Sequence, residues 1–319
     1  MRSAARATTA VEPASPGRFL SVLDFGPAEL SACLGLAADF KAARTGRRPH
    51  ARPLEGQHVA LLFEKPSLRT RSTFQIAVRE LGGDVIEPPQ DVALGGRESI
   101  EDVARNLERW VAAAVVRTFA QARLEAFAAA APRLRVINAL TDEEHPCQAL
   151  ADALTLIEKV GRLRGRTIAF VGDGNNVATS LAQIVVMLGG RVRVASPIGY
   201  QLSAEAAQAI RARAVRDAAL QLTSDPREAV AGADAVYTDV WASMGQEAEA
   251  GARRELFVPY RVDRALMAHA AAGALFMHCL PAHRGDEVTA EVIDGPSSVV
   301  FDQAENRLHT QKALLAMLA

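Results

Sequence analysis

Short apolar segments alternate along this chain with longer segments that have helical periodicity. Strand-like apolar runs lie at residues 58–63, 113–116, 135–138, 167–171, 191–195, 221–223, 233–238 and 274–277. A representative helical segment places Phe74, Ala77, Val78 and Leu81 at positions i, i+3, i+4 and i+7, on one face. Strands that alternate with helices predict an α/β fold, in which parallel sheets are covered by helices on both faces.

The length of 319 residues is enough for two domains, each with its own core. Helices are expected at residues 30–43, 67–81, 99–110, 124–131, 146–160, 179–188, 203–215, 225–231 and 304–318. We expect helix 146–160 to bridge two sheet-containing domains. The predicted division is a flexible tail over 1–17, a first domain over 18–150 and a second over 151–303. The C-terminal helix, about 304–319, is expected to pack back on the first domain.

Charge and cysteine usage exclude several classes of protein. The formal net charge is −1, whereas nucleic-acid-binding proteins are usually clearly basic. Cys33, Cys147 and Cys279 are far apart and form no CxxC pair, which disfavours a disulfide framework or a zinc site and favours a reducing compartment. No apolar run is long enough to span a bilayer. We therefore expect a cytoplasmic protein, although Arg2 and Arg6 in the tail leave a transit peptide open.

Polar clusters follow the apolar strands, where open α/β sheets bind their ligands. The first, Ser67-Leu-Arg-Thr-Arg71, stands after strand 58–63 and at a helix start. A helix N-terminus offers free N–H groups and the positive end of a dipole, and arginine binds phosphate oxygens in a bidentate way. Arginine opposes the dipole in a first helical turn, so an anion site is favoured over a capped helix with solvated arginines.

A second group of polar residues follows strands 113–116 and 135–138. Arg117 comes directly after the former, while His145 and Gln148 flank a proline suited to the first helical position. Both His145 and Gln148 can donate hydrogen bonds to one oxygen atom. Alone, Arg117 is typical of a surface charge and His145 of a simple cap. Together they favour a functional site.

Gly172-Asp-Gly-Asn-Asn176 follows strand 167–171 and is similar to a dinucleotide-binding turn. The third glycine of that fingerprint would fall at Val177, and no acidic residue ends the next strand, which runs into Ala195. The pattern therefore disfavours nicotinamide binding. Two asparagines at a strand end are better suited to a zwitterionic ligand.

Asp239 and Cys279 follow the last two predicted strands. A carboxylate at a strand end can bind an ammonium group, or it can form an Asx turn or cap a helix. A thiolate at a pocket mouth could act on a substrate amine, but a free cysteine is more usually a small buried hydrophobe. The residues alone leave both alternatives open.

Taken together, these segments resemble the aspartate/ornithine carbamoyltransferase family over about residues 19–319. The first cluster is similar to the family's carbamoyl phosphate signature Ser-x-Arg-Thr-Arg, and His145-Pro-x-Gln to its carbonyl-binding motif. Asp239-x-x-x-Ser-Met-Gly245 and His278-Cys-Leu-Pro281 resemble the ornithine branch of the family. The segment that ends at Arg307 resembles the last active-site segment.

The resemblance implies transfer of the carbamoyl group of carbamoyl phosphate to the side-chain amine of L-ornithine, giving L-citrulline and phosphate, with no cofactor or metal. Carbamoyl phosphate would be bound by Ser67, Leu68, Arg69, Thr70, Arg117, His145, Gln148, Cys279, Leu280 and Arg307. Ornithine would be bound by Asn176, Asp239, Ser243 and Met244. The catalytic residues would be Arg117, His145, Gln148, Asp239 and Cys279. The resemblance further implies a role in arginine biosynthesis, a homotrimer or a multiple of trimers, and a cis Leu280–Pro281 bond.

One loop departs from the family's pattern Gln-Leu-Gly-Arg-Gly-Glu. Residues 93–98 read Ala-Leu-Gly-Gly-Arg-Glu, so a glutamine contact to carbamoyl phosphate is missing at Ala93 and the arginine is shifted to Arg97. The alternatives are a carbamoyltransferase for a related amine, a nicotinamide-dependent dehydrogenase, and a non-catalytic paralogue. The residues do not distinguish arginine biosynthesis from arginine degradation, and they do not determine the substrate affinities.

Overall fold

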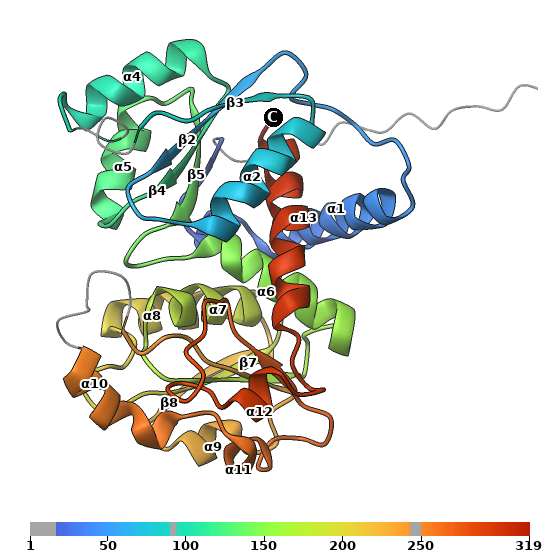
Figure 1. The fold of residues 1–319 in the computed structure, drawn as a ribbon, viewed down its shortest axis with the longest axis vertical. Helices are drawn as coiled ribbons and strands as arrows, with labels where there is room; N and C mark the ends of the chain where they lie inside the picture. Colours follow the sequence, from blue (N-terminus) through green and yellow to red (C-terminus); the bar gives the residue numbers. More distant parts are fainter. Residues whose placement is uncertain (1–16, 90–93, 95, 243–249) are drawn as a thin grey trace, which may run out of the picture.

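Two five-stranded parallel sheets form the centres of the two halves of the molecule (Figure 1). The computed structural model describes residues 17–89, 94, 96–242 and 250–319, apart from the side chains of residues 250 and 252. The first sheet has the order β1-β5-β4-β2-β3 and the second β10-β9-β6-β7-β8. The strands of the first are β1 (Arg18–Phe19), β2 (His58–Phe63), β3 (Asp84–Ile86), β4 (Ala113–Arg117) and β5 (Arg135–Leu140). Those of the second are β6 (Thr167–Val171), β7 (Arg191–Ala195), β8 (Ala219–Thr223), β9 (Ala235–Tyr237) and β10 (Leu275–Met277).

Helices cover both sheets, which confirms the predicted α/β class. The helices around the first sheet are α1 (Pro27–Thr45), α2 (Leu68–Glu80), α4 (Ile100–Trp110) and α5 (Gln121–Ala130), preceded by the short 3-10 helix η1 (Val22–Asp24). Those around the second are α7 (Asn176–Met187), α8 (Ala204–Ala212), α9 (Pro226–Val230), α10 (Ala250–Phe257), η3 (Val258–Tyr260), α11 (Arg264–Met267) and α12 (Ala290–Ile293). The two remaining helices, α6 (Pro146–Val160) and α13 (Val300–Leu318), lie at the junction of the two halves. None of the described helices is long and apolar enough to cross a membrane.

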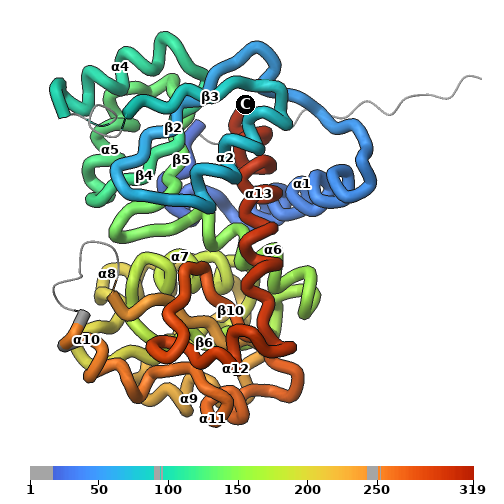
Figure 2. Tube along the Cα trace, viewed as in Figure 1, coloured from blue at the N-terminus to red at the C-terminus, as the bar shows by residue number. Residues whose placement is uncertain are grey.

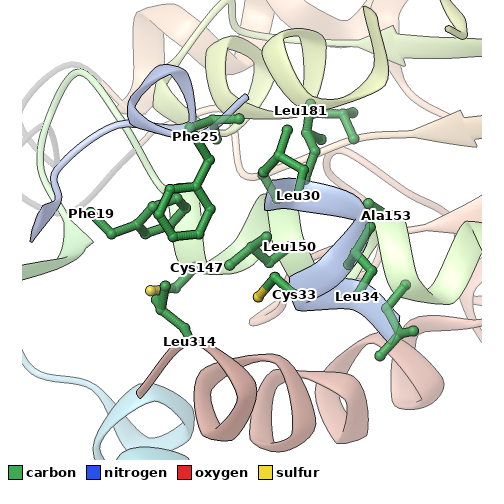
Figure 3. Close-up of a cluster of buried hydrophobic side chains, with 14 of the residues drawn as sticks. Phe19, Phe25, Leu30, Cys33, Leu34, Cys147, Leu150, Ala153, Leu181 and Leu314 are labelled. Atoms are coloured by element: carbon green, nitrogen blue, oxygen red, sulfur yellow. The ribbon is translucent and has the colours of Figure 1, made fainter. Parts of the chain in front are cut away.

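The junction is a continuous apolar core rather than a flexible linker. Helix α13, red in Figure 2, runs from the second half into the first and packs against α1, α2 and α6. Figure 3 shows Cys33 of α1, Leu150 of α6, Leu181 of α7 and Leu314 of α13 in one cluster, and all four are fully buried. This packing holds the two sheets in a defined relation, which determines the shape of the space between them. The domain boundary that we predict near residue 150 falls inside α6 and stays a prediction.

Most differences between prediction and structure concern short elements and element ends. Strands β1 and β3 and helices α10, α11 and α12 were not predicted, because elements this short show too little periodicity. Helix α7 begins at Asn176, three residues before the predicted start, because Asn175 Oδ1 accepts hydrogen bonds from the N–H groups of Val177 and Ala178. The strand predicted at 233–238 is only β9, residues 235–237. These shifts leave the strand ends, where polar clusters were predicted, in place.

Candidate active site

A cavity of about 950 Å³ lies between the two sheets, beyond the carboxyl ends of their strands. The predicted site residues that line it are Ser67, Leu68, Arg69, Thr70, Arg117, His145, Asn176, Asp239, Cys279, Leu280 and Arg307. Gln148 lies just outside the lining and is buried behind Arg307. Segments from both halves of the chain therefore meet in one space.

The N-terminus of α2 forms one wall of the cavity. Ser67 caps the helix, because its hydroxyl accepts a hydrogen bond from the N–H of Thr70 at 3.2 Å. Arg307 of α13 approaches the same turn and donates from Nη2 to the Thr70 hydroxyl at 2.8 Å. The expectation that Arg71 takes part in this cluster is wrong. Arg71 is absent from the cavity lining and forms an ion pair with Glu87 at 2.6 Å.

Positive charge accumulates on this wall, because Arg69, Arg117 and Arg307 all line it. Burial, together with the neighbouring Arg307 and Arg69, lowers the pKa of Arg117 to about 10. Burial also lowers the pKa of Arg307. A nearby anion stabilises the charged form of a guanidinium that is surrounded by like charges. This wall is therefore suited to bind a phosphate group.

His145 lies at the start of α6 and remains a neutral imidazole at pH 7. Burial and the nearby Arg307, Arg117 and Arg69 lower its pKa well below 6.5. Its backbone is held by an N–H bond to the Ser180 hydroxyl at 2.9 Å, and the same hydroxyl donates to Glu144 at 2.6 Å. Within the described part of the chain, its Nδ1 atom is buried without a hydrogen-bond partner. A neutral histidine in this position can donate one hydrogen bond into the cavity.

The opposite wall carries a thiol and a carboxylate. Cys279 Sγ donates to Asp239 Oδ1 at 3.0 Å, and Asn175 Nδ2 donates to Asp239 Oδ2 at 2.9 Å. Burial and the adjacent Asp239 raise the pKa of Cys279 well above its ordinary value. The side chain is therefore a thiol at neutral pH, which disfavours the thiolate, one of the two alternatives that the sequence left open. A carboxylate held by two donors is well placed to bind an ammonium group.

Three side chains near this wall are of types that can bind a metal ion. Donor atoms of Asp239, His278 and Cys279 all lie within 4.8 Å of one another. The ring of His278 is already engaged, because Nδ1 accepts from the Leu280 N–H at 2.9 Å and Nε2 lies 3.2 Å from Glu287. This arrangement orients the segment that carries Cys279, and we assign no metal to it.

Several cavity residues were not predicted. Lys65 forms an ion pair with Asp142 at 2.5 Å and lies over the ring of Phe119. Its position two residues after the end of strand β2 was a signal that could have identified it. Arg253 pairs with Asp173 at 2.7 Å, but it belongs to α10, which no sequence pattern predicted.

The glycine-rich turn has a structural explanation that needs no nucleotide. A Cβ atom on Gly174 would lie 2.4 Å from the backbone nitrogen of Leu202. The Gly174 N–H donates to the carbonyl of Tyr200 at 2.8 Å. The glycine is thus required by the close approach of two backbone segments.

Some predictions fall outside the described residues, namely those for Ser243, Met244 and Ala93. Arg97 is described, but it is exposed and does not line the cavity. The predicted cis bond between Leu280 and Pro281 is confirmed. Asn176 lines the cavity, and its amide donates to the carbonyl of Thr141 at 2.6 Å.

Two family models match consecutive parts of the chain. The carbamoyl-P binding domain of aspartate/ornithine carbamoyltransferase matches residues 18–158, and the Asp/Orn binding domain of the same family matches residues 164–318. The chain belongs to the aspartate/ornithine carbamoyltransferase family. The recognition made from the motifs is therefore confirmed.

Relatives within the family are similar over nearly their whole length. The ornithine carbamoyltransferase of Parafrankia sp. is 53% identical over 302 residues, which are 94% of this chain and 95% of that protein. The solved structure of ornithine carbamoyltransferase from Pyrococcus furiosus has a TM-score of 0.92 and 45% identity, covering 96% of this chain and 98% of that one. The Thermus thermophilus enzyme has a TM-score of 0.85 and 43% identity, covering 95% and 99%. Each of these structures shares the two-domain fold described above.

Proposed function

We propose that this chain is an enzyme that transfers the carbamoyl group of carbamoyl phosphate to the side-chain amine of L-ornithine, giving L-citrulline and phosphate. The observation that carries this proposal is the cavity itself. It places the guanidinium wall of Arg69, Arg117 and Arg307 opposite the Asp239–Cys279 pair. An anionic carbamoyl donor and a cationic amino-acid acceptor would therefore meet between walls of matching charge.

The proposed donor site lies at the N-terminus of α2. The phosphate group would be bound by Ser67, Leu68, Arg69, Thr70 and Arg117, with Leu68 contributing its backbone N–H. Arg117 and the neutral His145 would donate hydrogen bonds to the carbamoyl oxygen. One amide hydrogen of Gln148 is taken by Asp152, so its Nε2 has one further hydrogen to offer. Arg307 would add positive charge, and Cys279 and Leu280 would contact carbamoyl phosphate from the other wall.

In the proposed reaction, the neutral amine of ornithine attacks the carbamoyl carbon. Negative charge develops on the carbonyl oxygen, the bond from carbon to the phosphate oxygen breaks, and the ammonium formed loses a proton. Donors aimed at that oxygen lower the barrier by several kcal/mol, typically about 10²–10³ in rate for each donor. Holding both substrates in line contributes further.

The proposed acceptor site is the Asp239 wall. Ornithine would be bound by Asn176, Asp239, Ser243 and Met244, with its side-chain amine near Asp239 and Cys279. Because Cys279 is a thiol that donates to Asp239, the carboxylate is the group able to attract the amine proton. Removal of that proton from the ammonium form would release the nucleophile.

The remaining attributes of the enzyme are also proposals. We propose a cytoplasmic homotrimer, or a multiple of trimers, that acts in arginine biosynthesis. We further propose that residues 18–150, with helix 304–319, form the carbamoyl phosphate domain and that 151–303 form the ornithine domain. Growth of an arginine auxotroph that lacks this activity would test the biosynthetic role, because only net citrulline formation would restore growth.

The function is tested by citrulline formation from carbamoyl phosphate. Ornithine, putrescine, N-acetylornithine and aspartate would be compared as acceptors in parallel, with carbamoylated product measured for each. Strong activity with ornithine alone is expected, which would also show that Ala93 is tolerated. Activity only with another amine would overturn the substrate assignment, and inactivity with all four in a folded sample would favour a non-catalytic role.

A further inference from the structure

A buried carboxylate lies behind the cavity, between helices α6 and α13. Asp152 is fully buried and does not line the cavity. Its Oδ1 atom accepts two hydrogen bonds, from Gln148 Nε2 at 2.8 Å and from Gln303 Nε2 at 2.9 Å. The mechanism proposed above gives Asp152 no role.

The amide oxygens of Gln148 and Gln303 accept hydrogen bonds from two different segments of the chain. Gln148 Oε1 accepts from Arg307 Nη1 at 2.5 Å, and the other terminal nitrogen of Arg307 donates to Thr70 on the phosphate wall. Gln303 Oε1 accepts from the backbone N–H of His278 at 3.0 Å, next to Cys279. A continuous hydrogen-bonded chain therefore runs from the N-terminus of α2 to the segment that carries the thiol.

The acceptor character of Asp152 determines the orientation of both amides. A carboxylate accepts hydrogen bonds and donates none, so each glutamine must turn its NH₂ group toward Asp152. Each amide oxygen then points outward, toward Arg307 in one case and toward the His278 N–H in the other. If the Gln148 amide were reversed, its NH₂ would face the guanidinium of Arg307, which has no acceptor.

We propose that Asp152 is a positioning residue that orients Gln148 and Gln303. It thereby couples the Arg307–Thr70 contact at the N-terminus of α2 to the segment that carries Cys279. The reacting groups on both walls would then be held in one mutual geometry. Small displacements of such groups are costly, since a misplacement of about 1 Å can reduce a rate about 100-fold.

Energetics support a role beyond stability. Burial raises the pKa of Asp152 to about 6, against the hydrogen bonds from Gln303 and Gln148 that lower it. The other charged or titratable neighbours are Arg307 of α13, Tyr237 of β9 and Cys279 after β10. Buried ionisable networks can often be replaced by apolar residues without loss of stability. A carboxylate placed here at such a desolvation cost is better explained by the geometry that it imposes.

The experiment compares Asp152→Leu, Asp152→Asn and a matched control, Thr155→Val. Thr155 lies one turn further along α6 and accepts a hydrogen bond from Asn306 of α13 at 2.9 Å, so the control removes a link between the same helices away from the cavity. For each folded variant, kcat and both KM values for citrulline formation would be measured. The rate of alkylation by iodoacetamide would be measured as well. This rate reports on Cys279, because Cys33 and Cys147 are fully buried.

We expect Asp152→Leu to lower kcat about 100-fold and to change the alkylation rate several-fold. Asp152→Asn should retain kcat within about tenfold, because its remaining Oδ1 atom can still accept from both amides. Thr155→Val should lower stability but leave kcat and the alkylation rate at the wild-type values. If Asp152→Leu does not fold, Gln303→Leu breaks the same chain and should show the same two effects.

The proposal is overturned if Asp152→Leu behaves as wild type, if Asp152→Asn is as impaired as Asp152→Leu, or if Thr155→Val reproduces the loss. The kinetic part rests on the proposed function, whereas the alkylation part does not. A wild-type protein that forms no citrulline would therefore overturn the proposed function, and alkylation rates would still decide the role of Asp152.

Discussion

At the scale of single residues, the surroundings of His145 and Cys279 fix the protonation state of each side chain. His145 is kept neutral by burial and three guanidiniums, and Cys279 is kept protonated by burial and Asp239. These states decide which group can donate a hydrogen bond and which can accept a proton. Arg71, only two residues from Arg69, takes no part because Glu87 pairs with it.

His145 should matter for both activity and the pH dependence of stability. We expect His145→Ala to lower kcat about 10²–10³-fold, because one donor to the carbonyl oxygen is lost. Since the folded pKa is below 6.5, the unfolded chain binds the proton more readily, so this contribution to stability is present above pH 6.5 and is lost as pH falls. Denaturant unfolding between pH 5 and 8 should show that the free energy of unfolding falls less on acidification in the variant than in the wild type. An unchanged slope would contradict the assigned protonation state.

Asp239 and Cys279 can be separated by conservative replacements. Asp239→Asn removes the carboxylate that accepts the hydrogen bond from Cys279, and we expect about a 100-fold loss of kcat. Cys279→Ser keeps an O–H donor to Asp239 and should lose less than tenfold. The measurement is kcat for citrulline formation across pH 6–9. A larger loss for the serine variant would assign the main role to the sulfur atom.

At the scale of elements, helix starts and tight turns position the side chains of the candidate site. Ser67 caps α2 and Asn175 caps α7, so both helices begin at the cavity. The turn before α7 can approach residues 200–202 only because Gly174 has no side chain. Backbone packing at this turn therefore supports Asn175, which in turn holds Asp239.

Gly174→Ala tests this packing. A Cβ at 2.4 Å from a backbone atom forces the turn to move, and we expect a loss of about 1–3 kcal/mol in the free energy of unfolding. Gly35→Ala in α1 is the matched control, because nothing lies within 4 Å of its added Cβ. That change should stabilise the protein by about 0.5–1 kcal/mol. Equal effects of the two substitutions on denaturant unfolding would exclude the steric explanation.

At the scale of the whole molecule, α6 and α13 create the site by joining the two sheets. Arg307 comes from the last helix, yet it contacts Thr70 of α2 and Gln148 of α6. The positive wall therefore depends on packing between segments more than 150 residues apart in sequence. The same core, which contains Leu150, Leu314 and Cys33 of α1, keeps that geometry in place (Figure 3).

The proposed trimer is a prediction at this scale. Three chains of 34.0 kDa give about 102 kDa, and sedimentation equilibrium would measure the mass directly. We expect this mass or a multiple of it at micromolar concentration. A species of the mass of one chain, with full activity, would contradict the proposal.

The sequence by itself determined the fold class and eleven of the residues that line the cavity. Apolar runs and helical periodicity predicted β2, α6, β6 and β7 with the bounds that the structure has. These elements are long enough for the pattern to be recognised. Since strand ends gather at one edge of a parallel sheet, the polar residues that follow them could be assigned to one site.

The tertiary structure alone decided the burial and the contacts of those residues. Burial and partners distant in sequence decide that Arg71 does not line the cavity and that Cys279 is a thiol. They also place Lys65 and Arg253 in the cavity lining. The pairing of Asp152 with Gln303 joins residues 151 positions apart, and no local pattern encodes it. The pKa shifts arise from neighbours in three dimensions, so they cannot be predicted from the spacing of residues along the chain.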